Sequence, residues 1–147
     1  MNRLKFLSRL GVLICTLLFC VANVGAQSGT CGDNITWTLN NGTLTFSGSG
    51  PMPTYSNTND MTWREYKESV TNIVVEDGIT SICRNAFDQF TNVVSITAHT
   101  VTNMHDYAIR YCSSLSTIDI PNLAEYPAGE GNTLSFKNTP WYTSQAD

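Results

Sequence analysis

Few residues of this sequence could carry chemistry, and their spacing does not match a reactive site. The chain has two histidines, His99 and His105, without the H-x-x-x-H or H-E-x-x-H spacing that places two zinc ligands on one helix face. None of the serines lies in a G-x-S-x-G context, which is typical of a hydrolase nucleophile. We therefore predict no catalytic residues and no enzymatic activity, and we interpret both histidines as surface or edge residues.

Two short segments could suggest ion or phosphate binding. Glu76-Asp77-Gly78 supplies one acidic pair, whereas a calcium loop needs several oxygen ligands spaced along it. We interpret it as a turn in which glycine adopts a conformation that other residues resist. Gly48-Ser49-Gly50 is too short for a phosphate-binding loop and lacks its lysine. We predict no metal and no cofactor.

The cysteines do not form a disulfide framework. Cys15 and Cys20 lie in an apolar N-terminal run, and Cys31, Cys83 and Cys112 follow it without any C-x-x-C pair. These three allow at most one internal disulfide and do not favour a zinc site. We expect Cys83 and Cys112 to be buried as small hydrophobic residues, so a packed core must hold the fold.

The N-terminus is typical of a signal peptide over residues 1–26. Basic residues open the chain, an apolar run extends from Leu10 to Val24, and Val24-Gly25-Ala26 offers small residues for signal peptidase. The run is short for a membrane span, which needs roughly 20 apolar residues. We predict a secreted or cell-surface protein with no membrane insertion after signal cleavage. An uncleaved anchor helix and a lipoprotein attached through Cys20 are the alternatives.

The chain after residue 26 is strongly acidic. The signal region holds three of the eight basic residues and none of the twelve acidic ones, which leaves five against twelve and a net charge of −7. An acidic surface repels phosphate backbones, so we predict no nucleic-acid partner. Lys and Arg form no cluster on an amphipathic helix, which argues against binding at a membrane surface.

An internal repeat of 22 to 23 residues is the clearest feature of the sequence. Residues 70–92 align with residues 93–114 after a one-residue gap, and a third copy begins at Leu115. Apolar residues fill the matching positions: Val70/Val93/Leu115, Ile73/Ile96/Ile118, Val75/Ala98/Ile120, Ile79/Val101/Leu123, Ile82/Met104/Tyr126, Ala86/Ala108, Phe87/Ile109 and Phe90/Cys112. The period lies within the range of leucine-rich repeats.

The spacing within each copy predicts a strand followed by a short helix or helical turn. The last two apolar residues of each opening run, such as Ile73 and Val75, are two positions apart and share one strand face. Further on, Ile82, Ala86 and Phe90 are spaced at helical intervals. One copy cannot bury its apolar face alone, so the copies must stack, with strands about 4.8 Å apart.

These patterns resemble the BspA-like leucine-rich repeat family of bacterial surface proteins. The matching segments are Gly78-Ile79-Thr80-Ser81-Ile82, Ala86-Phe87 and Cys112-Ser113-Ser114-Leu115 in the repeats, and Gly29-Thr30-Cys31-Gly32, Trp37-Thr38-Leu39, Gly42-Thr43-Leu44 and Gly48-Ser49-Gly50 before them. Thr139-Pro140-Trp141-Tyr142 is similar to a segment that follows the repeats in larger members. Cys83 and Phe90 depart from the family pattern, which usually has glycine and cysteine there. The resemblance implies adhesion to host proteins or to other cells.

A β-hairpin is predicted over residues 34–47. Ile35, Trp37 and Leu39 alternate with polar residues, and Asn40-Asn41-Gly42 separates them from the alternating Leu44 and Phe46. An Asn-Gly pair between alternating strands favours a type I′ turn, which needs positive φ at both central residues. We expect the hairpin to shield the open end of the stack, because terminal repeats need a cap.

A loop and a short helix are expected between the hairpin and the repeats. Gly48 to Asp60 is rich in loop-forming residues, and Thr62 to Ser69 reads as one or two helical turns. Thr62 can cap this helix, with Glu65 completing a capping box. We expect Trp63 and Tyr66 to pack on the first repeat.

We therefore predict a mainly β fold with short helical turns, namely a leucine-rich repeat solenoid of about three repeats preceded by a β-hairpin cap. The expected divisions are a signal peptide over 1–26, a hairpin and capping segment over 27–69, repeats over 70–126, and an irregular repeat end or C-terminal cap over 127–147. The last segment either folds back as a cap or marks a shortened relative of a longer solenoid.

The predicted binding site is the outer face of the sheet. Outward residues form two columns: Asn72, Ser95 and Thr117, and Val74, Thr97 and Asp119. Solenoids commonly bind partners on such faces, although a merely solvated polar face is equally compatible with these small side chains. We predict a secreted or cell-surface interaction module that binds host or cell-surface proteins. The alternative is a structural or truncated remnant without its own ligand.

Overall fold

The computed structural model describes residues 25–124 and 139–140. The predictions for residues 1–26 and 127–147 therefore lie almost entirely outside the described residues. Over the described part, the chain is mainly β with two short 3-10 helices, in agreement with the predicted class. In the same part, no helix is both long and apolar enough to cross a membrane.

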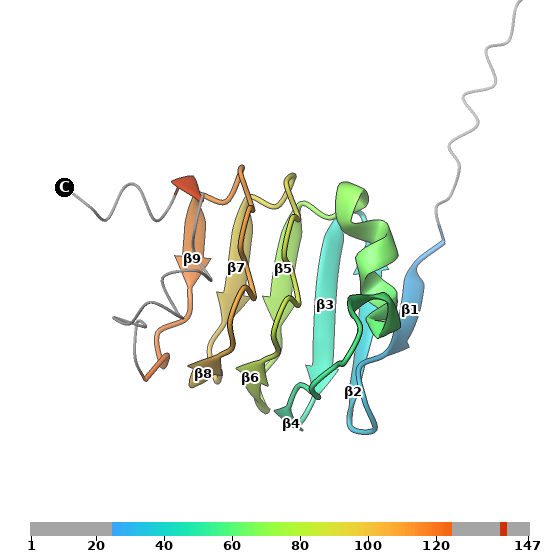
Figure 1. Ribbon diagram of the computed structural model, residues 1–147, viewed down its shortest axis with the longest axis vertical. Coiled ribbons are helices and arrows are strands. Elements are labelled where there is room, and N and C mark those ends of the chain that lie inside the picture. The colour runs from blue at the N-terminus through green and yellow to red at the C-terminus, as the bar shows by residue number, and fades with distance from the viewer. Residues whose placement is uncertain (1–24, 125–138, 141–147) are drawn as a thin grey trace, which may run out of the picture.

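Six strands form the larger sheet in the order β1-β2-β3-β5-β7-β9 (Figure 1). Their bounds are β1 Gln27–Thr30, β2 Ile35–Asn40, β3 Thr43–Gly48, β5 Asn72–Val75, β7 Ser95–Ala98 and β9 Thr117–Asp119. The pairs β1–β2 and β2–β3 are antiparallel, whereas β3, β5, β7 and β9 are parallel. Asn72 lies opposite Ser95, and Ser95 lies opposite Thr117, which is the register that the repeat alignment predicts.

Strands β2 and β3 form the hairpin expected around Asn41-Gly42. These two residues have φ values of 48° and 78°, as the central residues of a type I′ turn require. The apolar residues of β2 are buried and its threonines are exposed, because one face of the strand packs on the interior. Strand β1, which we did not predict, pairs with β2 and extends the sheet.

A second, smaller sheet was also missed. It consists of three short parallel strands, β4 (Gly50–Pro51), β6 (Ile79–Ile82) and β8 (Asn103–Met104), in that order (Figure 1). The prediction of a plain loop over Gly48 to Asp60 is therefore wrong at β4 and at the 3-10 helix η1 (Thr58–Asp60). Met52 N–H donates to the Ser81 carbonyl, so the partner that orders this segment is distant in sequence.

The third side of each copy is a run of turns. Of the two predicted alternatives, a short helix or a helical turn, the helix is not formed. Residues 84–89 and 106–111 form successive turns. Left-handed φ values between 59° and 65° interrupt them at Asn85, Gln89, Tyr107 and Tyr111, and an α-helix excludes such values. The amide N–H groups of 85, 87 and 89 donate to the carbonyls of 106, 108 and 110. The amides of 86, 88 and 90 donate to carbonyls three residues earlier in the same copy. Hydrogen bonds between copies therefore alternate with bonds that close single turns, whereas an α-helix would close every bond within one copy.

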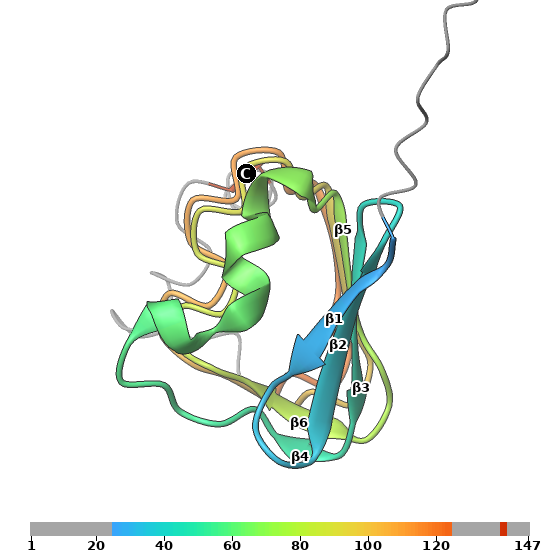
Figure 2. The same cartoon turned by 90° about the vertical axis from the view of Figure 1, so that its right-hand side faces the viewer.

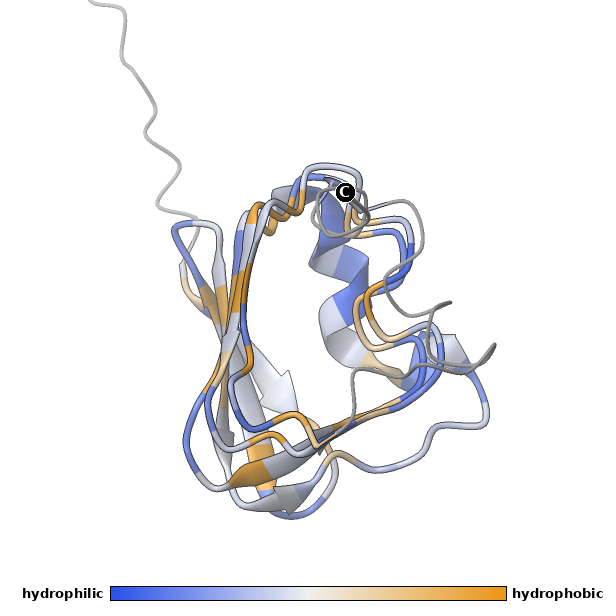
Figure 3. Ribbon diagram, turned by 90° about the vertical axis from the view of Figure 1, so that its left-hand side faces the viewer, coloured by the Kyte–Doolittle hydropathy of each residue, from blue (hydrophilic) through white to orange (hydrophobic). Residues whose placement is uncertain are grey.

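The two sheets and the turns surround one apolar interior, and the second 3-10 helix η2 (Thr62–Ser69) lies beside the end formed by β1–β3 (Figure 2). Apolar segments of successive copies overlie one another around this interior (Figure 3). Nearly all of the matched positions are buried, including Val70, Ile73, Ile79, Ile82, Ala86, Phe87, Phe90, Val93, Ile96, Val101, Ala108, Ile109, Cys112 and Leu115. The expected burial of Cys83 and Cys112 is confirmed.

Helix η2 is present, but its predicted capping box is not formed. Met61 is the N-cap residue and makes no side-chain capping bond. The hydroxyl of Thr62 instead accepts a hydrogen bond from the indole N–H of Trp37, with 2.9 Å between the heavy atoms. The cap prediction failed because a buried tryptophan needs an acceptor, and Thr62 supplies it.

The aromatic residues of η2 face two different parts of the fold. Trp63 is fully buried, and its indole N–H donates to the Ala86 carbonyl at 2.9 Å, so its predicted packing on the first repeat is confirmed. Tyr66 was predicted to do the same, but its ring packs on Trp37 with 5.7 Å between centroids. The Tyr66 hydroxyl donates to the side chain of Gln27. Helix η2 therefore joins the hairpin to the repeats.

Candidate binding surfaces

The six predicted site residues lie on β5, β7 and β9 in the two expected columns. One column contains Asn72, Ser95 and Thr117, and the other contains Val74, Thr97 and Asp119. They alternate with more deeply buried apolar residues and are partly or fully exposed. The predicted geometry is confirmed, and the role of these residues in binding stays a prediction.

The same surface continues across the hairpin, although the predicted binding site contained no hairpin residue. Thr43 lies opposite Asn72 and Thr45 opposite Val74, while Thr38 lies opposite Thr45 on the other side. We call this surface the sheet face. Its hydroxyl-bearing residues are Ser28, Thr30, Thr36, Thr38, Thr43, Thr45, Ser47, Ser95, Thr97 and Thr117. The alternation of threonine with apolar residues in 35–46 was the signal that could have revealed this extension.

Side-chain hydrogen bonds fix part of the sheet face. The Ser95 hydroxyl donates to the Asn72 side-chain oxygen at 2.8 Å, and the Asn72 amide group donates to the Thr71 hydroxyl at 3.1 Å. A side chain held in this way loses less conformational freedom when a partner binds. The centre of the sheet face is therefore preorganised.

One ion pair lies at the edge of the sheet face. The imidazole Nε2 of His99 is 2.8 Å from Asp119 Oδ2, and both side chains are more than half exposed. The hydrogen bond to Asp119 raises the pKa of His99, and the charge of Asp119 adds to this effect. His99 is a surface residue, as predicted, but its contact with a predicted site residue was missed.

Large polar and aromatic residues gather on the turns, where no site was predicted. The guanidinium of Arg110 lies 4.4 Å from the ring centroid of Tyr107 and 4.9 Å from that of Tyr111. Asp88, which is almost fully buried, accepts two hydrogen bonds from Arg110 at 2.9 and 3.0 Å. The guanidinium of Arg84 also lies over the Tyr107 ring, 5.2 Å from its centroid. We call these five residues the turn cluster.

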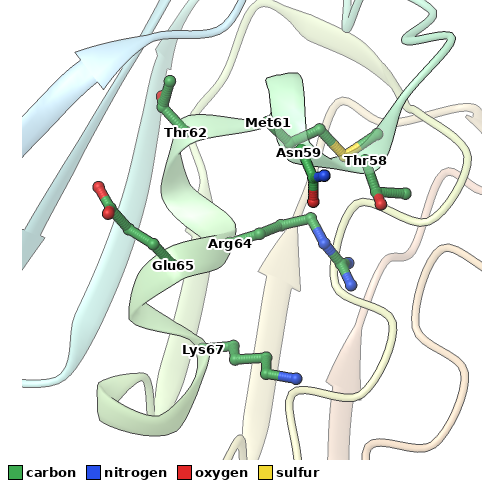
Figure 4. A pocket seen from close by; sticks show the side chains of 7 residues that line it. All are labelled: Thr58, Asn59, Met61, Thr62, Arg64, Glu65 and Lys67. Atoms are coloured by element: carbon green, nitrogen blue, oxygen red, sulfur yellow. The ribbon is translucent and has the colours of Figure 1, made fainter.

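A hollow of about 430 Å³ lies beside η2. Arg64 and Lys67 extend into it from the same side of η2, whereas Thr62 and Glu65 point to the other side (Figure 4). Arg64 already donates to the Asn85 carbonyl and lies over the Phe90 ring, and its burial lowers the pKa of its guanidinium. Arg64 therefore holds η2 against the first repeat.

A second hollow of about 260 Å³ lies at the end of the smaller sheet. Its lining residues come from three successive strands or the segments that follow them: Thr54, Arg84, Asn103, Met104, His105 and Asp106. Hydrogen-bonding side chains dominate this lining, and Met104 is its apolar member. His105, like His99, is exposed as predicted.

The buried thiols are not activated. Burial raises the pKa of Cys31 to about 11 and those of Cys83 and Cys112 to about 12. Since the thiolate is the reactive form, these cysteines are poor nucleophiles at neutral pH. Among the described residues, no group of three His, Cys, Asp or Glu side chains could hold a metal ion.

Comparison with known proteins identifies the repeats. A family model described as a BspA type leucine rich repeat region, in six copies, matches residues 63–129. This match covers η2 from its second residue and the strands from β5 to β9. No curated protein matches the chain.

Two solved structures are similar to this chain. A leucine-rich repeat protein from Eubacterium ventriosum has a TM-score of 0.62 and 28% identity over 66% of this chain and 26% of its own. A leucine rich cell surface protein from Faecalibacterium prausnitzii has a TM-score of 0.36 and 20% identity over 65% of this chain and 33% of its own. The chain thus spans about a quarter and a third of the length of these two structures.

Proposed function

Because this chain is a BspA-type leucine-rich repeat protein over residues 63–129, we propose that it is a secreted or cell-surface interaction module without catalytic activity. Its partners are proteins on host or other cells, and it binds them through the sheet face. Export follows from the signal-peptide pattern of residues 1–26. Adhesion is the role that this family membership favours.

The proposed architecture is a repeat solenoid of three copies with the hairpin as its N-terminal cap. Parallel pairing of β5, β7 and β9 at matched positions supports the solenoid. The antiparallel strands β1–β3 support the cap, because they continue the sheet with a different connection. A cap of this kind covers apolar surface that the first repeat would otherwise expose.

The continuity of the sheet face is the observation that carries the proposed function. Its small side chains extend over six strands in register. Small hydroxyl groups allow another protein to approach the sheet closely, and fixed side chains such as Asn72 reduce the entropic cost of binding. A surface that extends over six strands suits a protein partner better than a small molecule, which needs a concave site.

Binding to cells tests this function with a matched pair of variants. The labelled exported chain should bind intact animal cells and should bind less after trypsin has removed their surface proteins. Thr97→Arg places a large cation in the centre of the sheet face, and we expect at least tenfold weaker binding. Thr80→Arg places the same side chain at an exposed position on β6 of the smaller sheet and should leave binding unchanged. Equal binding by both variants would contradict the use of the sheet face.

A structural or truncated remnant without its own ligand is the second candidate. The sheet face over β5, β7 and β9 lacks, among the described residues, the Trp, Tyr and Arg side chains that dominate binding energy in most interfaces. Cooperative unfolding of the exported chain together with no trypsin-sensitive binding to any tested cell type would favour this candidate.

A further inference from the structure

We propose that the hollow at the end of the smaller sheet is a glycan-binding subsite that takes one sugar ring. The hollow measures about 260 Å³ and is lined by Thr54, Arg84, Asn103, Met104, His105 and Asp106. It belongs to β4, β6 and β8, whereas the sheet face belongs to the other sheet. This subsite is therefore additional to the protein-binding function and does not depend on it.

Parallel pairing explains why these residues meet. Thr54 follows β4, Arg84 follows β6, and His105 and Asp106 follow β8. The three strands are parallel neighbours, so their carboxyl ends lie at the same edge (Figure 1). Side chains from three separate copies or segments are thereby gathered around one hollow, as at the strand ends of other parallel sheets.

Backbone hydrogen bonds hold the walls of the hollow in fixed positions. Asn85 N–H donates to the Asp106 carbonyl at 3.2 Å, and His105 N–H donates to the Ile82 carbonyl at 3.0 Å. Met52 N–H, two residues before Thr54, donates to the Ser81 carbonyl at 3.2 Å. The hollow is thus part of the rigid framework, which is a requirement for selective binding of a small ligand.

The turn cluster restrains the longest side chain of the hollow. Arg84 is exposed, and its guanidinium lies 5.2 Å from the Tyr107 ring centroid. The other side of the cluster is anchored, because Arg110 contacts the Tyr107 ring and makes two hydrogen bonds to buried Asp88. A cation–π contact limits the rotamers of Arg84 while its N–H groups stay able to donate.

The chemistry of the lining selects the ligand class. Arg84 supplies only donors, Asp106 supplies acceptors, and Asn103 and Thr54 supply both. A simple anion would meet Asp106 unfavourably, and an apolar ligand would leave these polar groups without partners. A compact neutral ring with several hydroxyl groups satisfies donors and acceptors together. A sugar residue of a glycan has this character.

Chemical-shift titration of the isotopically labelled exported chain tests the subsite. The probes are the neutral sugars galactose and N-acetylglucosamine, with sodium sulfate as the anion comparison. We expect at least one sugar to cause saturable shifts at the amides of Thr54, Arg84, Asn103 and Asp106, with a dissociation constant on the order of millimolar for a single ring. Sulfate should not reproduce these shifts.

Variants separate binding in the hollow from binding elsewhere. Asp106→Ala and Arg84→Ala should each weaken sugar binding at least tenfold, whereas Lys67→Gln at the hollow beside η2 should have no effect. Unchanged chemical shifts of the β5 and β7 amides show that each variant is folded. If Asp106→Ala is not folded, Asp106→Asn replaces it in the test. No saturable shift with any sugar, shifts with sulfate alone, or sugar binding by the Asp106 and Arg84 variants as strong as that of the unaltered chain would overturn the subsite. Since Thr97→Arg leaves this hollow intact, loss of cell binding in that variant is independent of the result.

Discussion

The sheet face and the turn cluster lie on opposite parts of each repeat copy and are built in different ways. The sheet face is regular, its residues are small, and its repeat strands pair at sequence offsets of 22 to 23 residues. The turn cluster has large side chains, left-handed backbone at Tyr107 and Tyr111, and an ion pair between buried Asp88 and partly exposed Arg110. Both surfaces cover the same apolar interior.

The difference shows that the two sides of a repeat copy are under different structural constraints. Strand positions that face outward are free of packing constraints and tolerate small polar residues in every copy. The turns hold their shape through contacts between unlike residues of adjacent copies, such as Asp88 with Arg110, 22 positions later. Large changes in stability are therefore expected on the turn side, and small changes on the sheet face.

The largest effect should come from the interior that both sides share. Phe87 on the turn side and Ile96 on β7 are both fully buried, so alanine at either position leaves a cavity. We expect Phe87→Ala to lower the free energy of unfolding by about 3–5 kcal/mol and Ile96→Ala by about 2–5 kcal/mol, measured by urea denaturation. A loss below about 1 kcal/mol for Phe87→Ala would show that the turns do not share the core.

Removal of an acidic residue should distinguish the two surfaces more sharply. The side chain of Asp88 is 7% exposed and that of Asp119 is 55% exposed. Asp88→Ala leaves Arg110 without its partner and should cost about 1–3 kcal/mol of unfolding free energy. The control Asp119→Ala should change it by less than about 0.5 kcal/mol. Similar losses in both variants would mean that Asp88 is not the anchor of the turn cluster.

Glycine substitutions should affect the stability of the fold differently on the two surfaces. Gln89 has a φ of 65°, a conformation that glycine adopts without steric cost, so Gln89→Gly should be neutral or should stabilise by up to about 1 kcal/mol. Thr97 lies within β7, and Thr97→Gly should destabilise by roughly 0.5–1 kcal/mol. Thermal unfolding of both variants checks the signs, and destabilisation by Gln89→Gly would contradict the left-handed turn.

The smallest effect concerns pH at the edge of the sheet face. Asp119 raises the pKa of His99 above its ordinary value of 6.5. The stabilisation from this pair is therefore fully present below the unfolded-state pKa and is lost as the pH rises through the folded-state pKa. An NMR titration should give His99 a raised pKa in the wild-type chain and an ordinary one in Asp119→Asn. Equal values in the two proteins would show that the pair does not form in solution.

Strand positions could be predicted from the sequence because their signal is local and repeated. Alternation in residues 35–46 predicted the hairpin, and matched apolar residues predicted the register of β5, β7 and β9. The two columns of the sheet face followed directly from that register. Burial was predictable for the same reason, since each apolar position recurs in the next copy.

The smaller sheet and the turns could not be predicted in the same way. Strands β4 and β8 have two residues each, which is too short to show a period, and their partners are distant in sequence. The spacing of Ile82, Ala86 and Phe90 matches a helix, but hydrogen bonds between copies override local propensity. The prediction of Thr62 as a cap failed because its hydroxyl accepts a hydrogen bond from Trp37, and this contact joins residues 25 positions apart.

The nearly constant sequence offset between copies also sets the length of chain between residues that contact each other. Ser95 bonds to Asn72 across 23 positions, and Arg110 bonds to Asp88 across 22. Each added copy therefore closes a loop of nearly the same length, with nearly the same entropic cost as the one before. Because folding speed falls as contacts become more distant in sequence, a chain of this design can grow by whole copies without placing its contacting residues further apart.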